Sequence, residues 1–214
     1  MSENNKDIDK LFRGLFDFPN GNLVVERMVS SSARIRGALA DLFSGYGKTA
    51  EGVLNETVRV KNYSGLIIVR DIHFYTFCEH HFLPFFGVAD VIYEPRQIIT
   101  GLGKIVRLVR DVHARRLQIQ ETMTKEIAED LMKVLNAKGA FVRTRARHLC
   151  ICSRGPSDDS AWTEVAYRLG TLSSRTIIEF FGASDQLSGY GPDHVDSPIG
   201  SSNRGGRNKK RAPR

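Results

Sequence analysis

Near the start of the chain, apolar residues recur at the three- and four-residue spacing that places them on one face of a helix. A first set precedes the turn-forming residues 19–21 and consists of Ile8, Leu11, Phe12 and Leu15. A second set lies between the serines at 30–32, which can cap a helix, and Gly45; it consists of Ile35, Ala38, Leu39, Leu42 and Phe43. The pattern predicts two short helices.

From Gly65 onward the apolar residues become β-branched and aromatic, which is typical of strands. Residues 66–69 and 72–75 predict a strand that leads into the tetrapeptide Cys78-Glu-His-His81 and a loop with Pro84. Residues 86–93 predict the strand that returns. We therefore expect a strand to deliver this Cys/His cluster to a loop.

Helical spacing returns after this pair of strands. One helix is predicted to start near Gly103, with Ile105, Leu108, Val109 and Val112 on its apolar face. A second is predicted from about Thr124, a candidate N-cap, to Asn136, which can end a helix in the left-handed conformation.

Residues 140–153 alternate as in one long strand, in which side chains two residues apart share a face. This alternation predicts that His148, Cys150 and Cys152 face the same way. Residues 162–169 predict a partner strand, and residues 173–181 fit either a strand or a helix. The whole pattern predicts an α+β fold, in which an antiparallel sheet carries a helical pair on one face and an N-terminal helical segment precedes it.

Composition excludes several classes of protein. Apolar residues make up 41% and charged residues 26% of the 214 residues, as in ordinary globular chains and unlike collagenous or wholly disordered ones. No run approaches about 18 consecutive apolar residues, and the first residues lack the pattern of a secretory leader, so we expect no membrane association. Three cysteines do not make a paired disulfide framework, which favours a cytoplasmic protein with free thiols.

The net charge of +7 is concentrated at the C-terminal end. Residues 201–214 hold six basic side chains and no acid, which leaves +1 for the rest of the chain. Because this tail has little that is apolar to fold around, we expect it to be solvated and disordered. The alternative is a weak, salt-sensitive contact with a polyanion; nucleic-acid binding is not predicted.

Two clusters carry the residue types of a metal site. Cys78 and His81 have the C-x-x-H spacing with which one loop can offer two ligands. Cys150 or Cys152 could supply a third, and the spacing leaves open which one does. Three ligands and one open position are typical of a catalytic zinc, which generates a nucleophile from water. His80 and His148 would then be candidates for acid–base catalysis.

Basic residues between the two clusters could bind phosphate. Lys104 and Arg107 are three residues apart and share a helical face, and Arg154 follows the second cluster. Taken alone, the pair could equally form a solvated helix face. Gln120 and Glu121 lie between the two predicted helices, where the carboxylate could accept hydrogen bonds from a guanine edge or could simply be exposed.

At these residues the chain resembles the GTP cyclohydrolase I family, zinc enzymes of the tunnelling fold. The motifs that carry the resemblance are 42–46, 69–72, 74–87, 101–107, 115–121 and 148–155, among them Cys-Glu-His-His, Gln-Ile-Gln-Glu and His-Leu-Cys-Ile-Cys-Ser-Arg-Gly. They cover about residues 33 to 155 in the family's order.

The resemblance implies a function and a site. The family hydrolyses GTP to 7,8-dihydroneopterin triphosphate and formate, a step of pterin and tetrahydrofolate synthesis. By resemblance, the zinc ligands would be Cys78, His81 and Cys150, and the acid–base histidines would be His80 and His148. Guanine would be bound by Gln120 and Glu121. The triphosphate would be bound by Lys104, Arg107 and Arg154.

The resemblance also implies assembly and domain limits. Family members form homo-oligomers, commonly decamers of two stacked pentamers, with active sites between subunits. The N-terminal helical segment would span residues 1–60, the tunnelling-fold catalytic domain 61–183, and the basic tail 184–214.

One departure from the family motif keeps an alternative enzymatic function open. Gly103 stands where the family usually has a serine associated with ribose opening late in the reaction. The chain could therefore be a specialised paralogue that opens the imidazole ring of GTP but stops at a pyrimidine nucleotide, or that feeds a deazapurine or other secondary pathway. A third reading is a binding protein with a structural zinc, which the combined presence of His80, His148, Glu121 and Lys104 disfavours.

Overall fold

The computed structural model describes residues 10–182. The chain divides between Leu172 and Ser173 into two compact units. The expected basic tail and the start of the first expected helix lie outside the described residues. The domain boundaries expected near residues 60 and 183 remain predictions.

The first unit contains most of the secondary structure. Residues 10–15 are helical, and the further helices are α2 (Gly21–Ser30), α3 (Ser32–Leu42), η1 (Ser44–Gly47), α4 (Ala50–Val53), α5 (Leu102–Arg107), the π-helix η2 (Leu108–His113), α6 (Gln120–Leu135) and α7 (Leu149–Cys152). The strands are β1 (Thr57–Arg59), β2 (Ile67–Cys78), β3 (Pro84–Glu94), β4 (Ile98–Thr100), β5 (Leu117–Gln118), β6 (Gly139–His148) and β7 (Thr163–Gly170). The second unit contains α8 (Ser174–Gly182).

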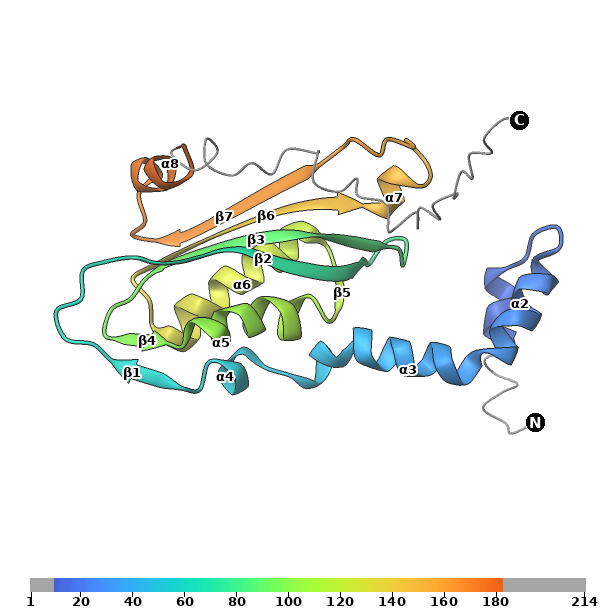
Figure 1. Cartoon of the computed structure of the whole chain (residues 1–214), viewed down its shortest axis with the longest axis horizontal. Coiled ribbons are helices and arrows are strands. Elements are labelled where there is room, and N and C mark those ends of the chain that lie inside the picture. Colours follow the sequence, from blue (N-terminus) through green and yellow to red (C-terminus); the bar gives the residue numbers. More distant parts are fainter. Residues whose placement is uncertain (1–9, 183–214) are drawn as a thin grey trace, which may run out of the picture. The chain divides into compact units, whose positions relative to one another are not determined.

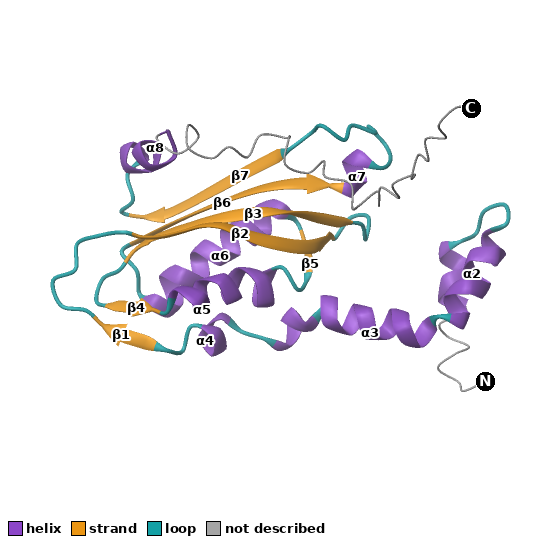
Figure 2. Ribbon diagram, in the orientation of Figure 1, coloured by secondary structure: helices purple, strands orange, loops and turns teal. Residues whose placement is uncertain are grey.

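Five strands form the main sheet in the order β5-β2-β3-β6-β7. All neighbours are antiparallel except β2 and the two-residue strand β5, which run parallel. Strands β1 and β4 form a separate antiparallel pair. Helices α5, η2 and α6 lie on one face of the main sheet (Figures 1 and 2). The expected α+β architecture, with a helical pair on one face of the sheet, is confirmed.

The core lies between this sheet and its helices. On β2 burial alternates, with Ile72, Phe74 and Thr76 buried and the residues between them exposed, as a strand with one covered face requires. Ile127 and Leu131 are fully buried on α6, which packs against β6 and β7 of the same sheet. Burying each large apolar side chain stabilises this layer by about 1.5–3 kcal/mol.

Several predicted elements need correction. Helix α2 was not expected, because Asn20 and Gly21 were interpreted only as a turn; Asn20, with φ 65°, instead precedes the helix directly. Helix α6 begins at Gln120 rather than Thr124, and the Thr124 hydroxyl donates to the Gln120 carbonyl at 2.7 Å inside the first turn. The segment that fitted either a strand or a helix is helix α8.

The prediction of one strand over residues 140–153 is wrong beyond His148. Strand β6 ends at His148, which pairs with Phe85 of β3. The next position of β3 is Pro84, which begins that strand and has no N–H to offer a further partner. The chain instead turns into α7, where the Ser153 N–H donates to the Leu149 carbonyl. Cys150 and Cys152 therefore do not share a strand face.

No helix in the part of the chain that the structure describes is long and apolar enough to cross a membrane.

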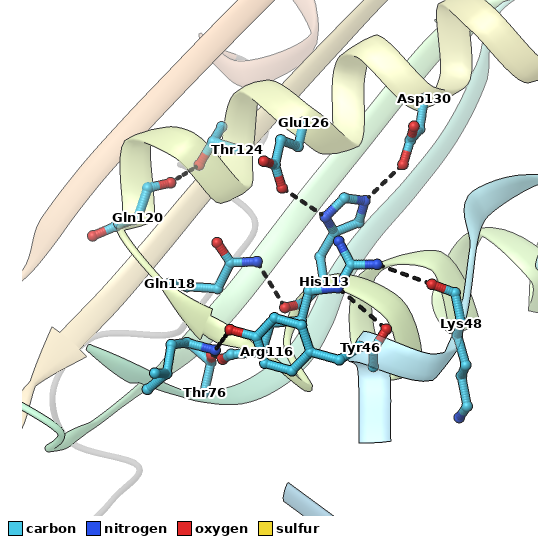
Figure 3. Close-up of polar contacts among 12 residues, drawn as sticks. Tyr46, Lys48, Thr76, His113, Arg116, Gln118, Gln120, Thr124, Glu126 and Asp130 are labelled. Carbon is cyan, nitrogen blue, oxygen red and sulfur yellow. Dashed lines mark hydrogen bonds and ion pairs between the residues drawn. The ribbon is translucent and has the colours of Figure 1, made fainter. Parts of the chain in front are cut away.

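A buried histidine joins η2 to α6. His113 is 2% exposed; its Nε2 lies 2.9 Å from Asp130 Oδ2 and its Nδ1 lies 3.4 Å from Glu126 Oε2 (Figure 3). Burial by itself would lower the pKa of His113, but the two carboxylates outweigh burial and raise the pKa above its ordinary value, although the Arg116 charge opposes them. The contact with His113 also lowers the pKa of Glu126.

These ion pairs make stability depend on pH. Because the pKa of His113 is raised by folding, its contribution is complete below the ordinary imidazole pKa of about 6.5 and is lost as pH rises through the folded-state pKa. We expect the melting temperature of a His113→Gln variant to fall below that of the wild type by more at about pH 6 than at about pH 9. A difference that stays constant between these pH values would show that folding does not shift the pKa of His113, and a larger difference at about pH 9 would show that folding lowers it.

Candidate metal centre and active site

A tight loop at the end of β2 presents the first two candidate ligands. The Phe82 N–H donates to the Cys78 carbonyl at 2.9 Å, and the Cys78 N–H donates to the Leu83 carbonyl at 2.8 Å. Phe82 has φ 54°, in the left-handed region, so the chain reverses within a few residues. This turn places His81 Nδ1 3.9 Å from Cys78 Sγ.

Helix α7 brings the third candidate to the same place. The ligand atoms of Cys78, His81 and Cys150 all lie within 4.8 Å of one another, and among the described residues Cys152 is not part of this group. Cys78 is buried, Cys150 half-buried and His81 exposed, so the cluster opens toward solvent on the histidine side. Two thiols and one imidazole are a donor set that suits zinc. The cluster can therefore hold a metal ion.

The environment of Cys150 disfavours a bare thiolate. Burial, followed by the neighbouring Cys78 thiol, raises the pKa of Cys150, although Arg154 acts in the opposite direction. A bound cation would offset this effect because metal ligation requires the thiolate.

His148 lies beside the cluster, at the end of β6. Its ring stacks on that of Phe85, with centroids 4.3 Å apart and planes 6° apart, and its Nε2 lies 2.9 Å from Gln120 Oε1. Burial lowers the pKa of His148, while the carboxylate of Glu121 opposes this shift. The other candidate acid–base group, His80, is exposed on the loop, with Nδ1 3.9 Å from Cys78 Sγ.

The start of α6 presents the two candidate guanine contacts differently. Glu121 is exposed in the first turn, where a carboxylate can accept hydrogen bonds from a ligand. Gln120 is 3% exposed, and its side chain is hydrogen-bonded to protein groups on β6 and β7. Only Glu121 therefore presents its side chain to solvent.

The candidate phosphate contacts do not all lie near the cluster. Lys104 Nζ lies 3.0 Å from Glu56 Oε1 and 3.4 Å from Asn55 Oδ1. The α5 helix that carries Lys104 starts beside β4, at the opposite end of the main sheet from α7 (Figure 1). Arg107 is exposed farther along α5, and Arg154 is exposed just after α7. Of these three residues, only Arg154 is close in sequence to a residue of the cluster, Cys150.

Two residues that sequence reasoning missed support these groups. The Gln118 carbonyl accepts from the Glu79 N–H at 3.0 Å and so ties the loop to β5. The Thr163 hydroxyl on β7 donates to Gln120 Oε1 at 2.6 Å. Gln118 lies within the 115–121 motif, but it acts here through its backbone carbonyl, which its residue type does not indicate. Thr163 lies outside the motifs and is 43 residues from its partner.

The chain as a whole is similar to proteins of one known family. The family model for GTP cyclohydrolase I matches residues 8–181. A protein of Synechococcus sp. named GTP cyclohydrolase 1 is 37% identical over 175 residues, which cover 81% of this chain and 74% of the relative. Proteins of the same name from Campylobacter jejuni and Porphyromonas gingivalis are 41% and 38% identical over 73% of this chain, covering 83% and 80% of their own lengths.

Proposed function

This chain belongs to the GTP cyclohydrolase I family, and we propose on that premise that it is an enzyme that hydrolyses GTP to 7,8-dihydroneopterin triphosphate and formate. The observation that carries the proposal is the cluster of Cys78, His81 and Cys150 with His148 beside it. A purely structural metal site would need neither an adjoining histidine nor an exposed side. We further propose that the protein acts in the cytoplasm, in pterin and tetrahydrofolate synthesis.

The residues of the cluster would hold a zinc ion. Cys78 and Cys150 supply thiolates from the end of β2 and from α7, and His81 supplies an imidazole from the loop. A zinc ion there would provide a Lewis acid that generates a nucleophile from water at neutral pH. The protein's part is to keep three donors together and to leave one side open to substrate.

The two histidines suit proton transfer because their environments differ. His148 is half-buried, with its ring plane held by Phe85 and one nitrogen held by Gln120. His80 is exposed on the loop that also carries His81. One group with a fixed orientation and one that can move toward the substrate could serve successive proton transfers to and from the purine and ribose.

The substrate would be recognised at its two ends. The exposed Glu121 carboxylate could accept hydrogen bonds from the N–H groups of guanine. Arg154 and Arg107 are exposed cations that suit the triphosphate, and Lys104 could add a third charge on exchanging its contact with Glu56 for one with phosphate. Glycine at 103 leaves open space, because an added Cβ would meet nothing within 4 Å.

We also propose that the active site is shared between copies of the chain. Helix α5, which carries Lys104, begins beside β4 at the end of the sheet opposite α7, which carries Cys150. One GTP molecule would therefore meet Lys104 and the metal cluster more readily if a neighbouring chain contributed one of them. A homo-oligomer, as expected from the family resemblance, would provide that neighbour, and a decamer of two pentamers is the arrangement we propose.

The first test follows formate and product mass together after GTP is added to the zinc-loaded protein. We expect stoichiometric formate and 7,8-dihydroneopterin triphosphate, because the cluster and both histidines are present. Accumulation of a pyrimidine nucleotide would show instead that the reaction stops early, and Gly103→Ser would then be expected to restore the complete reaction. Unchanged GTP would contradict the proposed activity.

The ligand assignment predicts different effects at two neighbouring cysteines. Cys150→Ala should remove a ligand, lower the bound zinc below half of the wild-type content and abolish turnover. Cys152→Ala is the matched control and should keep both, because Cys152 is not part of the cluster. Zinc content is measured by atomic absorption on dialysed protein. Equal losses in the two variants would refute the assignment.

Sharing of the site between chains predicts complementation. We expect Cys150→Ala and a Lys104→Ala, Arg107→Ala double variant each to be nearly inactive as pure proteins. Co-expressed with different tags and isolated as mixed oligomers, they should regain activity, with up to about a quarter of the sites intact if mixing is random. Mixed oligomers as inactive as either parent would show that each site is built from one chain.

A further inference from the structure

We propose that Gln120 is a positioning residue that, anchored by Thr163, fixes the tautomer of His148, with the hydrogen on Nε2 and the lone pair on Nδ1. Only the catalytic role of His148 rests on the proposed function. The tautomer itself follows from the hydrogen bonds around Gln120, whose side-chain amide is buried where solvent does not compete for its bonds.

The orientation of the Gln120 amide is set by backbone carbonyls. Its Nε2 lies 3.1 Å from the Thr144 carbonyl oxygen and 3.4 Å from the Thr163 carbonyl oxygen. Carbonyl oxygens only accept hydrogen bonds, so the NH₂ group must face them. The reversed amide would place its own oxygen against two oxygens in a buried site, which is unfavourable.

The threonines beneath the amide agree with this orientation. The Thr124 hydroxyl donates its one hydrogen to the backbone carbonyl of Gln120 at 2.7 Å (Figure 3). The Thr144 hydroxyl, 2.7 Å from that of Thr124, must therefore be the donor in their contact. Its remaining lone pairs can then accept from Gln120 Nε2 at 3.0 Å. Every donor in this group therefore has an acceptor.

With the amide oriented, its oxygen requires donors. Gln120 Oε1 lies 2.6 Å from the Thr163 hydroxyl and 2.9 Å from His148 Nε2. An amide oxygen has two lone pairs and cannot donate, so His148 Nε2 must carry a hydrogen. The Thr163 hydroxyl also lies 3.0 Å from the Ala146 carbonyl, and its shorter contact is the one to Gln120.

A neutral imidazole has one N–H, and with that hydrogen on Nε2 the lone pair is on Nδ1. The Phe85 stack holds the ring plane, so the direction of Nδ1 is set as well. Nδ1 is therefore the nitrogen that would accept a proton from the substrate. Gln120 acts on the reaction through His148, and its side chain need not touch guanine.

Kinetics distinguish this role from guanine binding. Gln120→Met keeps the size of the side chain but removes its hydrogen bonds; we expect kcat for formate release to fall roughly 100-fold while KM for GTP changes less than about threefold. Thr163→Val should lower kcat roughly tenfold, and Thr163→Ser, which keeps the hydroxyl, should restore it to within about threefold of the wild type. Thr171→Val is the control, because its hydroxyl bonds Glu94 instead.

A spectroscopic measurement tests the tautomer without activity. Solid-state NMR of the ¹⁵N-histidine-labelled holoenzyme, with His148 assigned by its loss in His148→Gln, should show the Nε2–H form in mildly alkaline buffer and a mixture of tautomers in Gln120→Met. An Nδ1–H form in the wild type would overturn the proposal.

The kinetic outcomes decide the remaining points. A raised KM with unchanged kcat in Gln120→Met would overturn the proposal in favour of guanine binding. Equal loss of activity in Thr163→Val and Thr163→Ser would overturn the part assigned to Thr163. If the wild type releases no formate, the proposed function fails, and the NMR spectrum alone decides the tautomer.

Discussion

The candidate site depends on the point at which strand β6 loses its partner. The pairing with β3 ends at His148, which lies opposite Phe85. The residue before Phe85 is Pro84, the first residue of β3, and proline has no N–H to donate to a further partner. The chain leaves the sheet there and turns into α7. That turn returns Cys150 to the end of β2, where Cys78 and the loop with His81 begin. A strand that continued to residue 153 would have carried Cys150 away from them.

Polar groups in the core join this site to the helical layer. Gln120 begins α6 and reaches strands β6 and β7, so one buried amide connects a helix, two strands and the ring of His148. In a low-dielectric interior, unsatisfied polar atoms are costly, and a fully bonded network specifies one arrangement. The geometry of His148 is thus determined by the same contacts that stabilise the packing of α6 on the sheet.

The two ends of the sheet have different chemical characters. Thiols and imidazoles gather where β2 and β6 end, while Lys104 lies near Glu56 beside the β1–β4 pair. In the single chain, the ammonium group of Lys104 is neutralised by protein carboxylate rather than by substrate. The proposed sharing of the site between copies follows from this separation, since a triphosphate needs cations near the point where its purine reacts.

Local pattern was sufficient for most elements and for the residue types of the site. Alternation and helical spacing predicted β2, β3, β7, α3 and the helices after β4, because these segments each bury one face against the rest of the protein. The Cys-x-x-His spacing predicted two candidate ligands that lie together, since one tight loop holds them. These inferences need only contacts between residues that are near in sequence.

Contacts between distant residues decided the rest. The end of β6 depends on Pro84 of β3. The start of α6 depends on β5, which pairs with β2 just before this helix. The orientation of Gln120 depends on Thr163, which is 43 residues away. Whether Cys150 or Cys152 joins Cys78 could not be read from alternation, because the chain at that point is a helical turn and not a strand. The sequence by itself determined which chemical groups are available and which segments carry them. Only the tertiary structure decided which groups meet, because strand pairing and buried hydrogen bonds are satisfied across the whole sheet.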